Sequence, residues 1–136
     1  VFSVNEAKFG YTEVKIGFVP AIVMVFLLRK LGETKVKELL LSGYLVTADK
    51  ALEFGLINKI VDKKELSEFV ETYAADLVRN NSANSLAVTK ELIGRVQSMD
   101  LDSALEVAAE ANATVRNSID CKRGIAAFLT GEQIFW

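Results

Sequence analysis

Histidine is absent from the 136 residues of the chain, and cysteine and proline occur only once each. Without histidine and with one cysteine, the chain cannot supply the usual ligands of a zinc site or the members of a Ser-His-Asp triad. We therefore predict no metal site, and any acid–base chemistry must rest on carboxylates, lysine or tyrosine. The lone Cys121 excludes an internal disulfide and favours a reducing compartment, so we expect a cytoplasmic protein.

An excess of positive charge is also missing. The chain has 16 Lys and Arg against 18 Asp and Glu, a formal net charge of −2, and its basic residues form no tract. This balance does not favour nucleic acid or an anionic membrane as a partner. The longest apolar run, residues 16–28, is too short to span a bilayer and contains Pro20, so a buried helix is the better interpretation.

Apolar residues, by contrast, are plentiful. They make up 51% of the chain, the upper edge of the globular average, which fits a chain that buries surface against another segment or a partner subunit. The length is enough for one domain. Because the chain begins at Val1 without an initiator methionine and opens on a strand-like piece, we expect it to be part of a longer protein.

The first part of the chain predicts a small α/β region. Residues 7–9 and 56–61 are predicted as short strands, and residues 11–19 as an extended segment or loop. Pro20 suits the first turn of a helix over residues 21–28, where its missing N–H costs nothing. Since this run is apolar all round, the helix should be buried on every side.

Helical periodicity dominates the remainder. Thr34 and Thr47 are predicted to cap short helices over residues 35–41 and 48–54. The later apolar spacings predict helices over residues 64–79, 85–96, 101–116 and 119–129. We therefore divide the chain into an α/β part, residues 1–62, and a helical oligomerisation region, residues 63–136.

A series of motifs runs along the chain in a fixed order. Ala7-x-Phe9-Gly10 is followed by Glu13, then by Gly17 after three residues and Pro20 after two more. Further matching stretches are residues 29–32, 37–43, 48–58 and 120–128. The series covers essentially the whole chain and resembles the carboxy-terminal half of the enoyl-CoA hydratases of the crotonase superfamily. The resemblance implies an α/β crotonase-like fold, a ββα spiral, of which this chain is a mainly helical part.

The same resemblance implies a role for Glu13. In hydratases of the family, the matching glutamate faces a second glutamate, and the pair holds a water molecule against the double bond of an enoyl-CoA thioester. Glu13 would deliver a proton to the carbon next to the thioester. The second glutamate and the N–H groups that stabilise the enolate oxygen come from earlier family segments, so we expect the isolated chain to be inactive. The plain alternative is that Glu13 is one exposed acid among 18 acidic residues.

Four other residues are predicted to contact the substrate by resemblance: Phe18, Pro20, Ala21 and Phe128. Phe128 matches a family phenylalanine that lines the acyl-CoA site, and it could equally anchor the last helix. The bound coenzyme A would be part of the substrate, so we predict no separate cofactor.

The chain departs from the family pattern in two places. The family usually has a Gly-rich Thr-Gln stretch after its proline, whereas residues 21–26 here are apolar and one residue shorter. Residues 130–132 carry no base where family members often meet CoA phosphates. Residues 12–21 are similar to the methylglutaconyl-CoA hydratase branch of bacterial leucine degradation.

Two alternatives stay open at this point. Enoyl-CoA isomerases share the crotonase fold and place their acidic groups differently, so fold alone does not decide the reaction. The chain could also be a non-catalytic helical module, because family members pack their C-terminal helices into trimers, often paired into hexamers.

Overall fold

Helices hold most of the chain, and the computed structural model describes all 136 residues. They form two units, Val1–Glu71 and Thr72–Trp136, with helix α4 (Leu66–Asn80) running from one into the other. None of the helices has the length and apolar content needed to cross a membrane. The small β part comprises four two-residue strands: β1 (Phe2–Ser3), β2 (Lys8–Phe9), β3 (Val46–Thr47) and β4 (Lys59–Ile60).

The strands of the first unit pair across long sequence separations. Strand β1 runs parallel to β4, with Phe2 opposite Lys59, and β2 runs antiparallel to β3, with Phe9 opposite Val46. An edge-to-face contact between Phe2 and Phe69, with ring centroids 5.0 Å apart, ties the start of the chain to α4. These pairings hold the segment that follows β2 against the helices of the unit.

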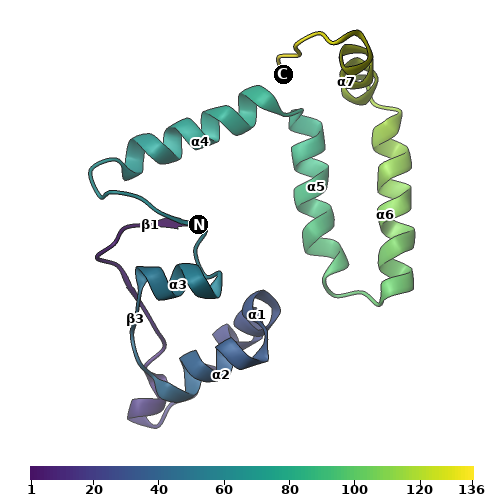
Figure 1. Ribbon diagram of the computed structural model, residues 1–136. Coiled ribbons are helices and arrows are strands. Elements are labelled where there is room, and N and C mark those ends of the chain that lie inside the picture. The colour runs from purple at the N-terminus through teal and green to yellow at the C-terminus, as the bar shows by residue number, and fades with distance from the viewer. The chain divides into compact units, whose positions relative to one another are not determined.

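Three helices follow that segment in the chain and lie in the same unit in Figure 1: α1 (Ala21–Leu31), α2 (Glu33–Ser42) and α3 (Ala48–Phe54). Helices α1 and α2 share a buried cluster of Leu27, Val36 and Leu40. A second cluster contains Ala48 and Ala51 of α3 and Ile57 from the segment after it. All the buried hydrophobic residues of the chain belong to this unit.

Helix α3 has the bounds predicted from sequence because both of its ends carry a strong signal. The Thr47 side chain accepts a hydrogen bond from the Lys50 N–H at 3.3 Å, which satisfies a free donor of the first turn. Gly55 ends the helix with φ +82°, a left-handed conformation in which any side chain would be strained.

The prediction that the helix after Pro20 is buried on every side is wrong for this chain. Helix α1 packs on α2 through one face, where Leu27 is buried, while Ile22 and Phe26 are 80% and 64% exposed. A helix that is apolar all round is satisfied only when it is covered all round, and the first unit covers one side.

Two other sequence predictions need correction. Helix α2 begins at Glu33 and Gly32 is its N-cap, so Thr34 lies inside the first turn and caps nothing. The predicted strand over residues 56–61 shortens to β4, because the N–H groups of Leu56 and Ile57 both donate to the Ala51 carbonyl at the end of α3.

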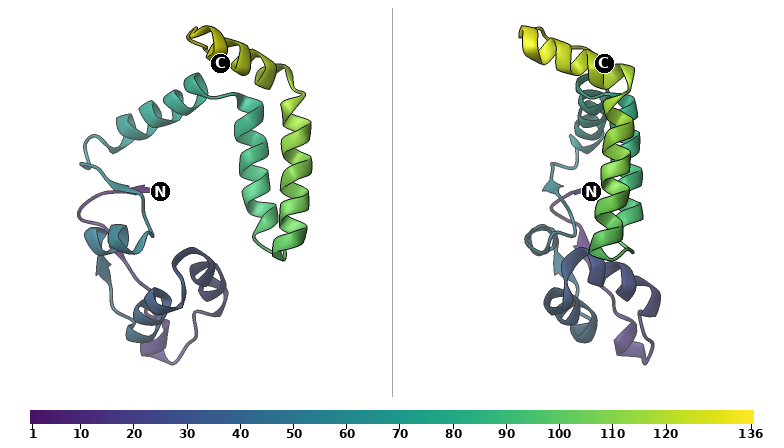
Figure 2. Two further views of the ribbon diagram at one scale, coloured as in Figure 1. Left: turned by 45° about the vertical axis from the view of Figure 1, so that its right-hand side comes forward. Right: turned by 90° about the vertical axis from the view of Figure 1, so that its right-hand side faces the viewer.

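The second unit is an arrangement of helices with polar caps. Helices α5 (Ala83–Val96) and α6 (Leu101–Arg116) contact each other and lie side by side in the left-hand view of Figure 2, and α6 also contacts α7 (Ile119–Thr130). Their starts are capped by Ser82, Asp100 and Ser118. The predicted helices of this part are confirmed, with ends displaced by one or two residues where they differ.

Candidate active site

The segment between β2 and α1 holds most of the residues predicted to act on the substrate. It contains a short 3-10 helix, η1 (Glu13–Ile16), where an extended segment or loop was predicted. The Lys15 N–H donates to the Thr12 carbonyl at 2.9 Å, and the Phe18 N–H donates to the Glu13 carbonyl at 2.9 Å. Glu13 therefore lies after a strand and shortly before the Pro20 helix, the position that the sequence predicted.

Gly17 makes this turn possible. It ends η1 with φ +78°, in the left-handed region that side chains rarely adopt, and no atom lies near where a side chain would begin. The constraint at this position is therefore the backbone conformation and not crowding. The turn sets the direction from which the chain enters α1.

Glu13 is half-buried, and its two carboxylate oxygens are not equivalent. Oε2 is withdrawn from solvent and accepts no hydrogen bond from any protein group. Neither of the two salt bridges, Lys37–Glu33 and Lys50–Glu53, involves it. A buried acceptor without a donor costs about 1–3 kcal/mol, and more when the group is charged, so such an atom calls for an explanation. An acceptor reserved for a proton of the substrate or of water is one such explanation.

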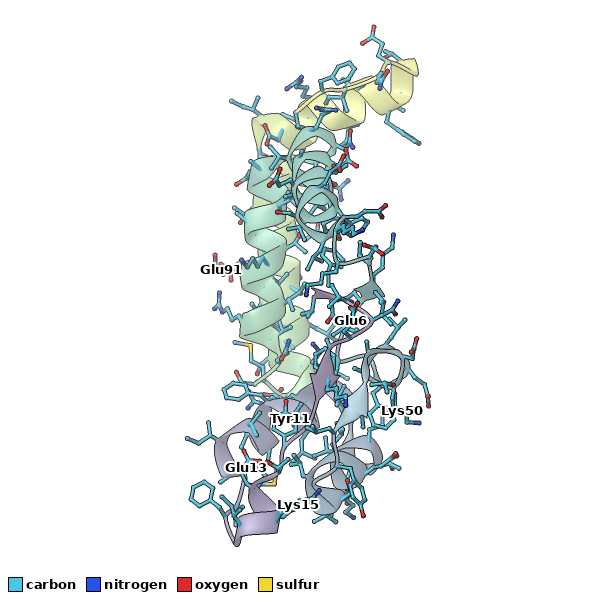
Figure 3. All side chains as sticks on the ribbon, turned by 90° about the vertical axis from the view of Figure 1, so that its left-hand side faces the viewer. Glu6, Tyr11, Glu13, Lys15, Lys50 and Glu91 are labelled. Atoms are coloured by element: carbon cyan, nitrogen blue, oxygen red, sulfur yellow. The ribbon has the colours of Figure 1, made fainter.

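Tyr11 lies two residues before Glu13, and sequence reasoning gave it no role. Its ring packs against the buried cluster of Leu27, Val36 and Leu40. Burial, and then the negative charge of Glu13, raise the pKa of the Tyr11 phenol above its ordinary value of 10.0. Figure 3 labels both side chains, Tyr11 on the segment before η1 and Glu13 at the start of η1. No pattern in the sequence marks the burial of Tyr11, because it depends on where α1 and α2 pack.

The lysine nearest to Glu13 in sequence is engaged elsewhere. Lys15 holds its ammonium group 4.5 Å from the centre of the Tyr44 ring, a cation–π contact. Glu13 is thus left without a cationic partner from its own turn.

The other predicted substrate contacts divide between the two units. Pro20 is the buried N-cap of α1 with φ −75°, Ala21 follows it, and Phe18 is 65% exposed at the same turn. Phe128 is on α7 in the second unit and is 85% exposed. The structure therefore groups Glu13 with three of the four, and the roles of all four stay predictions.

Metal ligands are not gathered anywhere in the chain. No group of three or more Asp, Glu or Cys side chains is placed to hold a metal ion.

Known proteins match this chain over most or all of its length. The model of the enoyl-CoA hydratase/isomerase family matches residues 1–136. A Thermus thermophilus protein provisionally named an enoyl-CoA hydratase is 46% identical over 124 residues, covering 91% of this chain and 49% of that protein. A short-chain-enoyl-CoA hydratase of Clostridium acetobutylicum is 30% identical over 131 residues, covering 96% and 50%.

Comparison of the fold with solved structures points to the same family. The crystal structure of an enoyl-CoA hydratase from Mycobacterium smegmatis superposes with a TM-score of 0.90 at 27% identity, over 99% of this chain and 52% of that one. The chain spans about half the length of each of these relatives. The predicted crotonase-like fold is confirmed. This chain belongs to the enoyl-CoA hydratase/isomerase family.

Proposed function

We propose that the protein that carries this chain is an enoyl-CoA hydratase, with Glu13 as one of two catalytic glutamates. The observation that supports the proposal best is the buried Oε2 of Glu13, which accepts no hydrogen bond from the protein and lies in the turn before α1. The hydratase names of two relatives agree with it.

The reaction needs a base and an acid on one substrate. Water adds its oxygen to the carbon two positions from the thioester carbonyl carbon, and a base takes the proton that water loses. A carboxyl group gives a proton to the adjacent carbon, which carries the negative charge of the enolate. We assign the second step to Glu13 and the first to a glutamate outside these residues. One proton leaves water and one reaches carbon, so the protons balance, but the base ends protonated and Glu13 ends ionised. A proton passed back from the base to Glu13, directly or through water, restores both groups for the next turnover.

The test is to offer the full-length protein two isomeric substrates. A hydratase lowers the absorbance of crotonyl-CoA, because hydration removes the conjugated double bond and yields 3-hydroxybutyryl-CoA. An isomerase instead raises that absorbance from a 3-enoyl-CoA, because it brings the double bond into conjugation. Rapid isomerisation without hydration would contradict the proposal and favour the isomerase alternative.

The identity of the substrate's acyl group is a separate and more specific proposal. Residues 12–21 are similar to methylglutaconyl-CoA hydratases, and the apolar start of α1 differs from the usual family pattern. We propose a branched acyl group of the leucine-degradation type, to be tested by comparing kcat/KM for 3-methylglutaconyl-CoA and for crotonyl-CoA. A clear preference for the unbranched substrate would place the protein in general fatty acid metabolism instead.

We also propose a cytoplasmic location, which the free thiol of Cys121 supports.

A second candidate role, assembly, has its own supporting observation. The unit Thr72–Trp136 contains no buried hydrophobic residue, although its helices carry several large apolar side chains that are mostly exposed. The most exposed of them are Val78, Leu101, Ile119, Phe128 and Leu129. Helices of this kind gain stability by burying such faces, so we propose a homotrimer or a hexamer built through this unit.

Sedimentation of the purified protein tests the assembly proposal. We expect a species of three or six chains at micromolar concentration, because the exposed apolar area disfavours a free monomer. Replacing Leu101 and Ile119, which are 73% and 83% exposed, with Glu should shift the protein toward smaller species. A protein that is strictly monomeric and folds cooperatively would contradict the proposal.

A further inference from the structure

The stretch of chain that carries Glu13 lies against one short segment, residues 43–45, which joins α2 to β3. The closeness begins at Gly10, just after β2. A methyl group at Gly10 would come within 2.8 Å of both the Tyr44 carbonyl oxygen and the Leu45 Cδ2. Ordinary contacts between carbon atoms are about 3.5–4.0 Å, so only a glycine allows this approach without a shift of the backbone. The segment thus holds the chain three residues before Glu13.

The same segment lies against the two residues that follow Glu13 in η1. A methyl group at Gly43 would come within 3.0 Å of the Val14 Cγ2 and 3.2 Å of the Lys15 Cε. The Lys15 ammonium group also meets the Tyr44 ring, 4.5 Å from its centre. Residues 43–45 therefore lie close to the chain on both sides of Glu13.

A side chain at residue 43 would displace the turn. The end of a lysine can swing aside, but valine is branched at Cβ and has few rotamers, so Val14 itself would have to move by a few tenths of an ångström. Val14 directly follows Glu13 in η1, a single turn closed by the hydrogen bond from the Phe18 N–H to the Glu13 carbonyl. The displacement would consequently reach Glu13. Catalysis is sensitive to such shifts, since a misplacement of about 1 Å can cost roughly a hundredfold in rate.

We propose that Gly43 is a positioning residue for proton transfer by Glu13. Its missing side chain lets residues 43–45 hold the η1 turn where the carboxyl group of Glu13 meets the substrate. The inference rests on the proposed function of Glu13 and deepens it. Gly43 acts through Val14 and the turn, and not on the substrate itself.

The first experiment compares Gly43→Ala with Gly55→Ala in the full-length protein. Gly55 is a matched control, because both glycines end a helix in the left-handed conformation, with φ +60° and +82°, but no atom lies within 4 Å of a side chain begun at Gly55. Both variants should lower Tm through backbone strain. We expect only Gly43→Ala to lower kcat, by about three- to tenfold with KM unchanged. Equal kcat values for the two variants would overturn the proposal.

A second substitution separates displacement of the turn from strain at the end of α2. Val14→Ala removes the Cγ2 atom that a side chain at residue 43 would meet first. In the Gly43→Ala background it should restore much of the lost kcat, while Tm stays low because the strained backbone remains. A double variant that is as slow as Gly43→Ala, or slower, would show that the loss comes from α2 and would overturn the proposal.

Asparagine provides the same comparison if Gly43→Ala does not fold. Among residues with a side chain, asparagine is one of the most tolerant of the left-handed conformation at the end of a helix, and it still carries the Cβ atom that would meet Val14. Gly43→Asn should therefore fold and lose kcat, whereas Gly55→Asn should keep it. A folded Gly43→Asn variant with the kcat of the parent would contradict the proposal.

The outcomes also separate this inference from the proposed function. If Glu13→Gln removes activity while Gly43→Ala and Gly55→Ala have equal kcat values, only the role of Gly43 fails. If Glu13→Gln hydrates its substrate at the normal rate, the assignment of Glu13 fails and the role of Gly43 fails with it.

Discussion

Glu13→Gln in the full-length protein should lower kcat for the hydration of crotonyl-CoA by roughly a hundredfold to ten-thousandfold, the usual contribution of a positioned acid–base group. Glutamine keeps the size and shape of the side chain but neither gives up nor accepts the proton. Because Oε2 accepts no hydrogen bond from the protein, the change to an amide breaks no protein contact at that atom. The loss should therefore appear in kcat and not in the stability of the turn.

Binding provides the internal control for this variant. A saturated acyl-CoA such as butyryl-CoA has no double bond to protonate, so its dissociation constant should be nearly unchanged by Glu13→Gln. Glu6→Gln is a matched control, because Glu6 is an exposed acid on the stretch between β1 and β2. Normal hydration by the Glu13 variant would show that Glu13 is only one of the surface acids.

The sequence predicted helices well where local chemistry marks both ends. Helix α3 lies between a threonine cap at Thr47 and a left-handed Gly55, and its bounds are the predicted ones. Helix α6 was predicted equally well, and the Asp100 side chain accepts a hydrogen bond from the Ser103 N–H at 3.0 Å at its start. Such signals involve only neighbours in the chain, so they are readable without knowledge of the tertiary structure.

Predictions failed where a remote contact or a competing local bond decided the outcome. Strand β3 has only two residues and exists because β2, far earlier in the sequence, lies beside it. Thr34 has the chemistry of a cap, but Gly32 already joins α1 to α2 and leaves no room for one. The exposed face of α1 was missed for a related reason, because an all-apolar sequence does not show which side another element covers.

In the candidate site, too, features set by local sequence were predicted and features set by tertiary packing were not. The place of Glu13 between a strand and the Pro20 helix followed from the spacing of Phe9, Gly10, Gly17 and Pro20. The phenol of Tyr11 did not, because a tyrosine in a loop-like stretch has no periodicity to mark it. Its burial arises only when α1 and α2 pack together and its ring lies against their shared cluster.

The 136 residues on their own should hydrate crotonyl-CoA at a rate at least a hundredfold below that of a full-length relative, such as the Clostridium acetobutylicum enzyme. The enolate oxygen needs preorganised N–H donors, and the loss of one such donor costs roughly a hundredfold to a thousandfold. The start of α1 is the obvious place in the chain to seek a substitute. Pro20 has no N–H, and the Ala21 N–H donates to the Val19 carbonyl at 2.8 Å.

Circular dichroism of the purified chain should accompany the assay, so that loss of activity is compared at retained helix content. A folded chain with Glu13 but without a facing carboxylate leaves the attacking water unoriented, and the advantage of proximity is lost along with the base. The positive end of α1 gives some favourable potential, but a helix dipole contributes only about 0.3–1 kcal/mol at an exposed site. That is far less than the barrier reduction that the two missing groups supply. Turnover comparable with that of the full-length relative would mean that these residues hold a second acid–base group and an anion site of their own.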